Sequence, residues 1–158
     1  MQKAVLNLSS WRIKINQMES KIIYTGETLK LMSLFESLTR TRLKDCFTDN
    51  NDMMTFVVMN GEIGKAIGKN ASNVKKLESM LNRKIKIVEF NSERVGFIRN
   101  LVNPIRPRNI TENEGIITIE SSDSKSRGLL IGRNASNLRN FETIAKKYYP
   151  EIKEIKVV

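Results

Sequence analysis

GKAIGKNASNVKKLE, residues 64–78, decides the fold of this chain, because the stretch occurs again as GLLIGRNASNLRNFE at residues 128–142. The two copies are offset by 64 residues, and 8 of their 15 aligned positions are identical. Structural repeats that stack into solenoids have periods of about 20–50 residues. The longer period here predicts two small tandem domains.

Each copy reads apolar residue, glycine, cation, asparagine and alanine, and then continues as an amphipathic helix. In the first copy Val74, Leu77 and Leu81 recur at helical spacing, which indicates one buried face. Asn70 and Asn134 stand where N-cap residues are expected. A glycine turn that opens onto a helix N-terminus is a natural phosphate site, because free N–H groups and the helix dipole both favour an anion.

Cations surround both turns. Lys69 and Arg133 stand at the two tips, and further cations lie nearby in the sequence: Lys65, Lys75, Lys76, Arg127 and Arg139. Backbone donors flanked by positive charge suit a nucleic-acid backbone. The alternative for a single copy is an ordinary helical corner that contains a glycine. A repeat kept only for packing should let its exposed tip drift, but here the tip is as similar as the buried face.

The segments IGKNASNV and IGRNASNL resemble the I-G-x-x-G-x-x-[IVL] signature of KH domains, whose GXXG loop clamps about four nucleotides. Together with LFESLTRTRLKDCF and KIKIVEF, the two units resemble archaeal NusA-like transcription termination/antitermination factors over roughly residues 27–158. The resemblance implies an RNA site formed by Lys65, Ile67, Gly68, Lys69, Asn70, Ala71 and Lys75 in the first copy and by Ile131, Gly132, Arg133, Asn134, Ala135 and Arg139 in the second.

Both copies depart from the signature, because Ala71 and Ala135 replace the second glycine. A methyl group there hinders close approach of a phosphate, so we expect RNA contact that is weakened and not abolished. Apolar residues would line the base-facing groove and its floor. They are Ile67, Val74, Ile131 and Leu138, with Ile85 and Ile87 for the floor of the groove. Core packing is the alternative for all of the first four and the preferred one for Val74 and Leu138.

The expected fold class is α+β, with the order αββααβ in each half. For the first half the sequence predicts a helix over 28–39, strands Leu43–Thr48 and Met53–Met59, a short helix Gly61–Ile67, the motif helix 71–81 and the strand Lys84–Phe90. For the second half it predicts a helix Glu93–Val102, strands Arg106–Thr111 and Gly115–Glu120 around the turn Glu112–Glu114, a segment Asp123–Ile131 leading into the loop, the motif helix 135–148 and the strand Lys153–Val158.

This order is that of type II KH domains, each with a three-stranded sheet packed on helices. We therefore expect two tandem KH domains of this type, at residues 27–90 and 91–158. Each is near the lower size limit for an independent core, so we expect the two to pack together. Residues 1–26 form an N-terminal extension that we expect to be partly disordered, and Met18 is an alternative start.

Composition restricts the function classes. The net charge is +10, and the excess is shared by residues 28–90 and 91–158, which fits a polyanionic partner. The alternative is a merely basic soluble protein. The chain has no histidine and one cysteine, Cys46, so an intrachain disulfide, a conventional zinc site and the usual nucleophile–base pairs are excluded.

We therefore expect no enzyme, no cofactor and no metal. The sequence has neither an 18-residue apolar run nor a secretory signal, so we expect a cytoplasmic protein without a membrane partner. The preferred interpretation is a monomeric single-stranded RNA-binding protein acting in transcription termination or antitermination. RNA polymerase is a second partner implied by the resemblance alone. The alternatives are a protein–protein adaptor with degenerate loops and a ribosome-associated or RNA-processing accessory factor.

Overall fold

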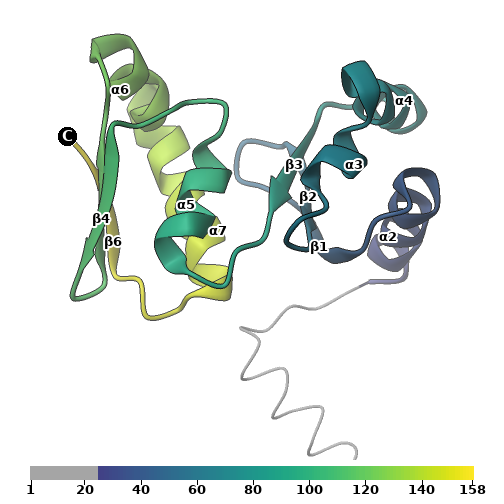
Figure 1. Ribbon diagram of the computed structural model, residues 1–158, viewed down its shortest axis with the longest axis horizontal. Helices are drawn as coiled ribbons and strands as arrows, with labels where there is room; N and C mark the ends of the chain where they lie inside the picture. The colour runs from purple at the N-terminus through teal and green to yellow at the C-terminus, as the bar shows by residue number, and fades with distance from the viewer. Residues whose placement is uncertain (1–24) are drawn as a thin grey trace, which may run out of the picture.

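The computed structural model describes residues 25–158, so the predictions for the N-terminal extension and for Met18 lie outside the described residues. The described chain has four layers (Figure 1). Helices α2, α3 and α4 cover one face of a first sheet, helices α5 and α7 lie between that sheet and a second one, and the second sheet closes the stack. We call residues 25–90 the first unit and residues 91–158 the second unit.

The first unit has the expected order αββααβ. Its strands pair in the order β1-β2-β3, with β1 antiparallel and β3 parallel to the central strand. Its elements are α2 (Gly26–Thr39), β1 (Leu43–Thr48), β2 (Met54–Val58), α3 (Ile63–Ile67), the 3-10 turn η1 (Lys69–Ala71), α4 (Ser72–Leu81) and β3 (Ile85–Glu89).

The second unit repeats this order and topology, with strand order β4-β5-β6, β4 antiparallel and β6 parallel to β5. Its elements are α5 (Arg94–Val102), β4 (Asn109–Asn113), β5 (Ile116–Glu120), α6 (Ser124–Ile131), the 3-10 turn η2 (Arg133–Ala135), α7 (Ser136–Tyr148) and β6 (Glu154–Val157). No helix among residues 25–158 is long and apolar enough to cross a bilayer.

One predicted hairpin was placed wrongly. Strand β4 covers Asn109–Asn113, so Glu112 and Asn113, predicted as a turn, belong to the strand. The turn consists of Glu114 and Gly115, both with positive φ (51° and 84°), which is the requirement of a tight type I′ hairpin. The start of the strand shifts as well, because Pro107 has no N–H to donate and the first ladder bond runs from Arg108 N to Glu120 O.

The first unit has a core of its own between α2, α4 and the inner face of its sheet. Phe35 of α2 stacks on Phe56 of β2 with ring centroids 4.5 Å apart. Leu77 of the motif helix is fully buried in the same cluster. Cys46 is buried there too, and its Sγ lies 3.7 Å from Met54 Sδ.

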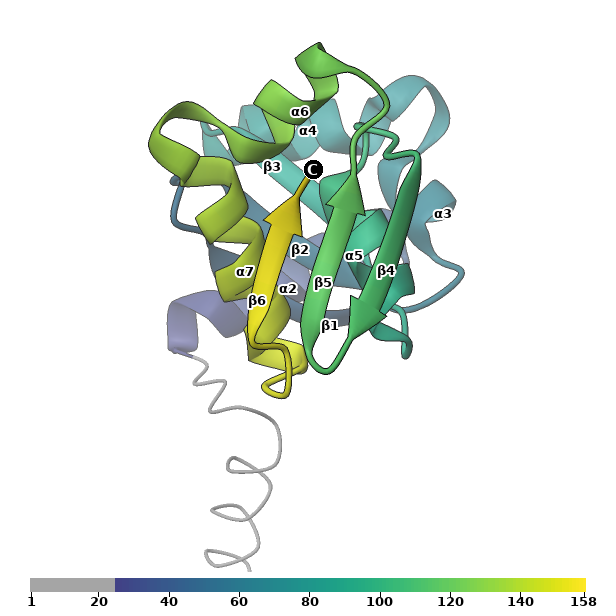
Figure 2. The same ribbon diagram turned by 90° about the vertical axis from the view of Figure 1, so that its left-hand side faces the viewer.

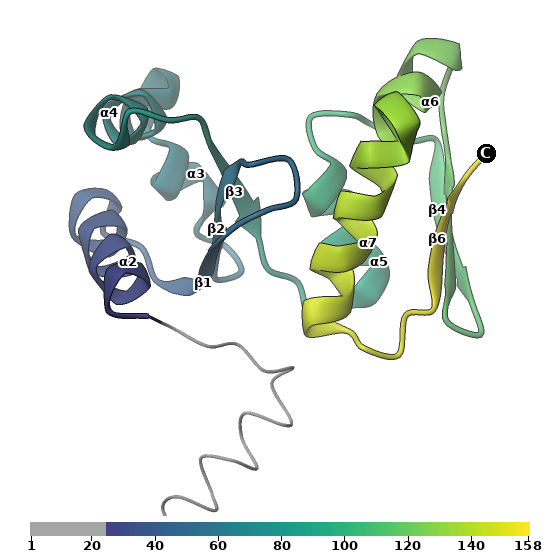
Figure 3. The ribbon, with the colours of Figure 1, turned by 180° about the vertical axis from the view of Figure 1, so that it is seen from behind.

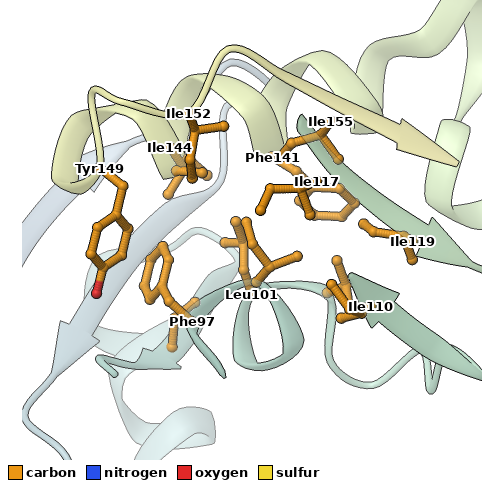
Figure 4. Packing of buried hydrophobic residues seen from close by; sticks show 14 of the residues in the cluster. Phe97, Leu101, Ile110, Ile117, Ile119, Phe141, Ile144, Tyr149, Ile152 and Ile155 are labelled. Carbon is orange, nitrogen blue, oxygen red and sulfur yellow. The ribbon is translucent and has the colours of Figure 1, made fainter. Parts of the chain in front are cut away.

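The second core spans both units. Figure 4 shows its centre, where Phe97 and Leu101 of α5 meet isoleucines of the second sheet and Phe141 and Ile144 of α7. Val57 and Val88, from the outer face of the first sheet, belong to this cluster and are 0% and 1% exposed. The two units therefore pack together as expected, through α5 and α7.

Polar contacts complete the interface around one buried carboxylate. Asp45 on β1 is 1% exposed. It accepts from Cys46 N at 2.7 Å and from the Tyr148 hydroxyl of α7 at 2.7 Å, while Lys147 Nζ lies 3.7 Å away. Burial lowers the pKa of Lys147 and the Asp45 charge opposes that effect. The Lys147 ammonium also lies 3.6 Å from the centre of the Phe47 ring.

The outer face of the second sheet has no such cover among the described residues. Figure 2 shows β4, β5 and β6 in front of every other element, and Figure 3 shows α5 and α7 on the opposite side of that sheet. Most side chains on this face are polar or charged, including Thr111, Thr118 and Lys156, and the partly exposed Ile116 lies among them. The same topology thus has a buried outer face in one unit and an open one in the other.

Candidate nucleic-acid interface

The two repeated loops begin with glycines of the same conformation. Gly68 has φ 78° and ψ 169°, and Gly132 has φ 73° and ψ 175°. This region of backbone space is essentially restricted to glycine. A Cβ on Gly68 would lie 2.8 Å from Ser72 Oγ, and one on Gly132 would lie 2.7 Å from Asn137 Cγ. The first glycine of each loop is therefore required both by its dihedral angles and by its neighbours.

The alanines at the second glycine position also have positive φ, but in a different region. Ala71 has φ 58° and ψ 29°, and Ala135 has φ 59° and ψ 24°, which is left-handed helical conformation. A residue with a Cβ adopts this conformation at a cost of about 1–2 kcal/mol. Alanine is thus strained at this position without being excluded from it, whereas alanine at Gly68 would be excluded.

The prediction that Asn70 and Asn134 are N-caps is wrong. Both residues lie inside the 3-10 turns with left-handed φ of 54° and 53°, and the N-cap positions of α4 and α7 fall one residue later, on the alanines. Neither helix receives a side-chain cap hydrogen bond there. No cap side chain therefore accepts from the amides of the first turn. These amides are free to donate to an anion, which is what an anion site at a helix N-terminus requires.

A pair of asparagines braces both loops in the same way. The side-chain amide of Asn73 donates to Lys65 O at 3.2 Å, and that of Asn137 donates to Leu129 O at 2.8 Å. Each bond joins the motif helix to the helix before the loop and thereby fixes the width of the turn. Sequence reasoning gave these residues no role, although their identity in both copies was a signal.

The predicted site residues are brought together around each loop. The cations are exposed, as are the two tip asparagines: Lys65, Lys69, Asn70 and Lys75 in the first unit and Arg133, Asn134 and Arg139 in the second. Ile67 and Ile131 are half-buried immediately before the loop glycines and lie outside both core clusters. Exposed cations thus flank a strip that is apolar and partly accessible.

The ion pairs of the described residues do not involve the cations of the loops. Arg94 pairs with Glu112 and Glu151, both at 2.7 Å, and Arg108 pairs with Glu120 at 3.5 Å, all within the second unit away from the loop. By contrast, none of the predicted loop cations forms an ion pair with another described residue. Their charge is consequently available to an external anion.

The apolar groove residues divide into two groups. Val74 and Leu138 pack against the two cores, so the packing alternative is confirmed for them, and Ile85 is buried in the first core. Ile87 of the edge strand β3 also packs against the first core, but it is only partly buried and faces a cleft of about 470 Å³. Arg99 and Arg106 line the same cleft, and no motif pointed to them because they lie outside the repeated stretches.

Comparison of the sequence with known proteins agrees with the resemblance to NusA-like factors that the two repeated stretches indicated. The chain is 30% identical over 127 residues to the probable transcription termination protein NusA of Halobacterium salinarum, covering 79% of this chain and 91% of that protein. The chain belongs to the NusA family of archaeal transcription termination proteins.

Another NusA protein, that of Methanocaldococcus jannaschii, is 28% identical over 142 residues, which cover 88% of this chain and 76% of the relative. No family model matches the sequence. Among solved structures, the crystal structure of APE1850 superimposes with a TM-score of 0.67 at 26% identity, over 85% of this chain and 100% of that one. The NusA likeness therefore includes both units, and the α+β arrangement of two three-stranded sheets packed on helices is consistent with KH-like domains.

Proposed function

We propose that this chain is a transcription termination factor that binds single-stranded RNA through two tandem type II KH domains, at residues 27–90 and 91–158. The observation that supports the proposal most directly is the repeated loop. Two loops of the same backbone conformation each combine a strained glycine turn, a helix N-terminus without a side-chain cap, and cations that form no ion pair with another described residue. This combination suits the sugar-phosphate backbone of RNA.

The arrangement of the two units supports one binding surface for a single strand. Helices α4 and α6 both lie toward the upper edge in Figures 1 and 3. The buried contacts of α5 and α7 hold the units in one orientation, so an RNA strand bound at one loop meets a fixed second site. The role in termination is inferred from the names of the NusA relatives, and contact with RNA polymerase is part of the same proposal.

The test is fluorescence anisotropy with a random single-stranded RNA of about 12 nucleotides, at 50 and 200 mM salt. Wild type is compared with the double charge reversal Lys69→Asp and Arg133→Asp, at the loop tips. The matched control is Lys153→Asp with Lys156→Asp, which makes the same charge change at exposed residues of the second unit without ion pairs among the described residues.

Binding that weakens steeply with salt and is lost only in the loop variant supports the proposal, because each neutralised phosphate contributes about −0.7 to the log–log salt slope on single strands. Equal losses in both double variants would indicate nonspecific attraction to a basic surface. No binding by wild type at 50 mM salt contradicts RNA binding and favours the adaptor, for which a polymerase pull-down is the next experiment.

A further inference from the structure

A cleft of about 470 Å³ lies between the two units, at the free edge of β3. The first unit contributes one wall, from α3 and β3, and the second unit contributes the other, from the end of α5 and the segment that follows it. The lining residues are Ile63, Ile87 and Glu89 of the first unit and Arg99, Asn100, Asn103, Ile105, Arg106 and Pro107 of the second.

The charged side chains of the second-unit wall are open to a ligand. Arg99 and Arg106 are exposed, and neither forms an ion pair with another described residue. A guanidinium is a planar fork that binds a phosphate through two hydrogen bonds and also stacks on bases. Two such groups at one cleft favour an anion that also carries a flat ring.

The rest of the lining suits that ring. Ile63, Ile87 and Ile105 give the cleft apolar surface from three different elements. Among the described residues of the lining, only Glu89 has a carboxylate, which accepts from Gly61 N at 3.3 Å through one oxygen. A carboxylate has about four acceptor positions, so Glu89 retains acceptors for an amino group.

The cleft adjoins the first loop through α3. This helix begins at Ile63 in the cleft and ends at Ile67, directly before Gly68. With a helical rise of 1.5 Å per residue, the two ends are roughly 8 Å apart, well within the reach of the four or so nucleotides that a KH loop holds. RNA bound at the first loop would therefore extend to the cleft.

We propose that this cleft between the units holds one base of the bound RNA strand, with Arg99 and Arg106 on the adjacent phosphates and Glu89 selecting a base that carries an amino group. The inference rests on the proposed RNA-binding function. It deepens that function by adding residues of the second unit to the first unit's groove and by assigning a base preference to that groove.

The second unit has no equivalent carboxylate. Phe90 N donates to Val58 O at the end of β3, and Val158 N donates to Ile119 O at the end of β6, so Val157 occupies the position of Glu89. Valine has no acceptor for an amino group. The base preference should therefore be a property of the first groove alone.

The phosphate contacts are tested with Arg99→Gln and Arg106→Gln combined, against Lys153→Gln and Lys156→Gln as the charge-matched control, in the full chain. Each phosphate contact changes the salt slope by about 0.7, so wild type should lose roughly sevenfold more affinity than the arginine variant between 50 and 200 mM salt. The control variant should keep the wild-type slope. Circular dichroism establishes that both variants are folded.

The base preference is tested with the RNA dodecamers C12 and U12. Cytosine carries an amino donor at position 4 and an acceptor at N3, whereas uracil carries a carbonyl acceptor at position 4 and an N–H donor at N3. Wild type should prefer C12 about fivefold or more, the lower end expected for one base contact. Glu89→Gln should bring the ratio close to 1, because a side-chain amide can donate to uracil as well as accept from cytosine.

The outcomes separate the two proposals. Wild-type RNA binding with an unchanged slope in the arginine variant, or with the same C12 to U12 ratio in wild type and Glu89→Gln, overturns the cleft and leaves the two loops as the site. Wild-type protein that binds neither dodecamer, nor random RNA at 50 mM salt, overturns the RNA-binding function itself and the cleft with it.

Discussion

The two sheets have the same strand order and the same mixture of parallel and antiparallel pairing, yet their outer faces differ. The first sheet presents Val57 and Val88 to α5 and α7, and both valines are buried. The corresponding face of the second sheet presents Thr118 and Lys156, and no other element of residues 25–158 covers it (Figure 2). The two units thus share the conformation of their loops, while only the first sheet has its outer face packed against helices of the other unit.

The largest effect is expected from variants that place a charge on the outer face of each sheet. Val57→Asp should destabilise the protein by more than about 4 kcal/mol, because it buries an unpaired carboxylate under α5 and α7. Thr118 occupies the position in β5 that Val57 occupies in β2. Because the outer face of the second sheet is open, Thr118→Asp should destabilise the protein by about 1 kcal/mol or less. Urea unfolding measures both.

Should the first variant fail to fold, the alanine pair makes the same comparison. Val57→Ala should cost about 2 kcal/mol in the core and Thr118→Ala about 0.5 kcal/mol. Equal costs at the two positions would mean that α5 and α7 do not cover the first sheet in solution.

The next effect concerns the polar part of the interface. Asp45→Ala removes the acceptor for the Tyr148 hydroxyl and leaves Lys147 without its carboxylate. Breaking a buried pair costs about 3–5 kcal/mol, and we expect the lower end because the Lys147 side chain keeps 30% exposure.

Thr111 is the matched control for Asp45, because the two residues occupy equivalent positions of their sheets. Asp45 pairs with Val57 of the first central strand, and Thr111 pairs with Thr118 of the second. Thr111→Ala should change the stability by about 0.5 kcal/mol or less, since the residue is exposed. A cost at Asp45 as small as this one would show that the contact with α7 contributes nothing to stability.

The two loops have the same conformation, so equivalent substitutions in them should change the stability of the protein by equal amounts. Substitutions to and from glycine test this expectation. Gly68→Ala and Gly132→Ala should each destabilise by about 2–3 kcal/mol, because the conformation is restricted to glycine and a Cβ meets the following helix. Ala71→Gly and Ala135→Gly relieve a strain of about 1 kcal/mol. Most of that gain is offset by the greater entropy of glycine in the unfolded chain.

Thermal unfolding of these four variants measures the effects. A Gly68→Ala variant as stable as wild type would contradict the loop conformation described above. Unequal effects at Gly68 and Gly132 would show that the second loop depends on its neighbours from the first unit, since Asn137 also accepts from Asn51 at 3.0 Å.

The smallest effect is expected for the chemical reactivity of the Cys46 thiol, which depends on the burial of this residue in the first sheet. Burial, reinforced by the neighbouring Asp45 charge, raises the pKa of its thiol to about 12. At pH 8 the thiolate fraction is then about one in ten thousand, so reaction with a disulfide reagent should be undetectable in the folded protein. Rapid reaction in the native protein would contradict burial, whereas reaction only in the Asp45→Ala variant would tie opening of the sheet to the interface.

Much of the fold was predictable from the sequence, because hydrophobic periodicity and the repeated loop act locally. The order αββααβ and strand Leu43–Thr48 agree with the structure. The caps and the second hairpin were not predictable in this way. Asn70 looks like a cap in the sequence, but two consecutive left-handed residues move the start of the helix to the next position.

The interface was beyond the sequence for a different reason. Val57 reads as one more residue of a β-strand, and its partners lie far along the chain in α5 and α7. Arg99 and Arg106 have no counterpart in a repeat, and only the packing of the two units brings them beside Ile87 and Glu89. The loop residues agree in position with the prediction, while their contact with RNA stays a prediction.

The shared core also has a consequence for the order of events during protein synthesis. The first sheet is complete once Glu89 has been made, but its cover ends at Tyr148, 59 residues later in the chain. At about 5–20 residues per second, the ribosome needs roughly 3–12 s to make that segment. For this interval the nascent chain exposes Val57 and Val88 on an uncovered sheet. A pause in translation between these two points would prolong the exposure and should favour aggregation.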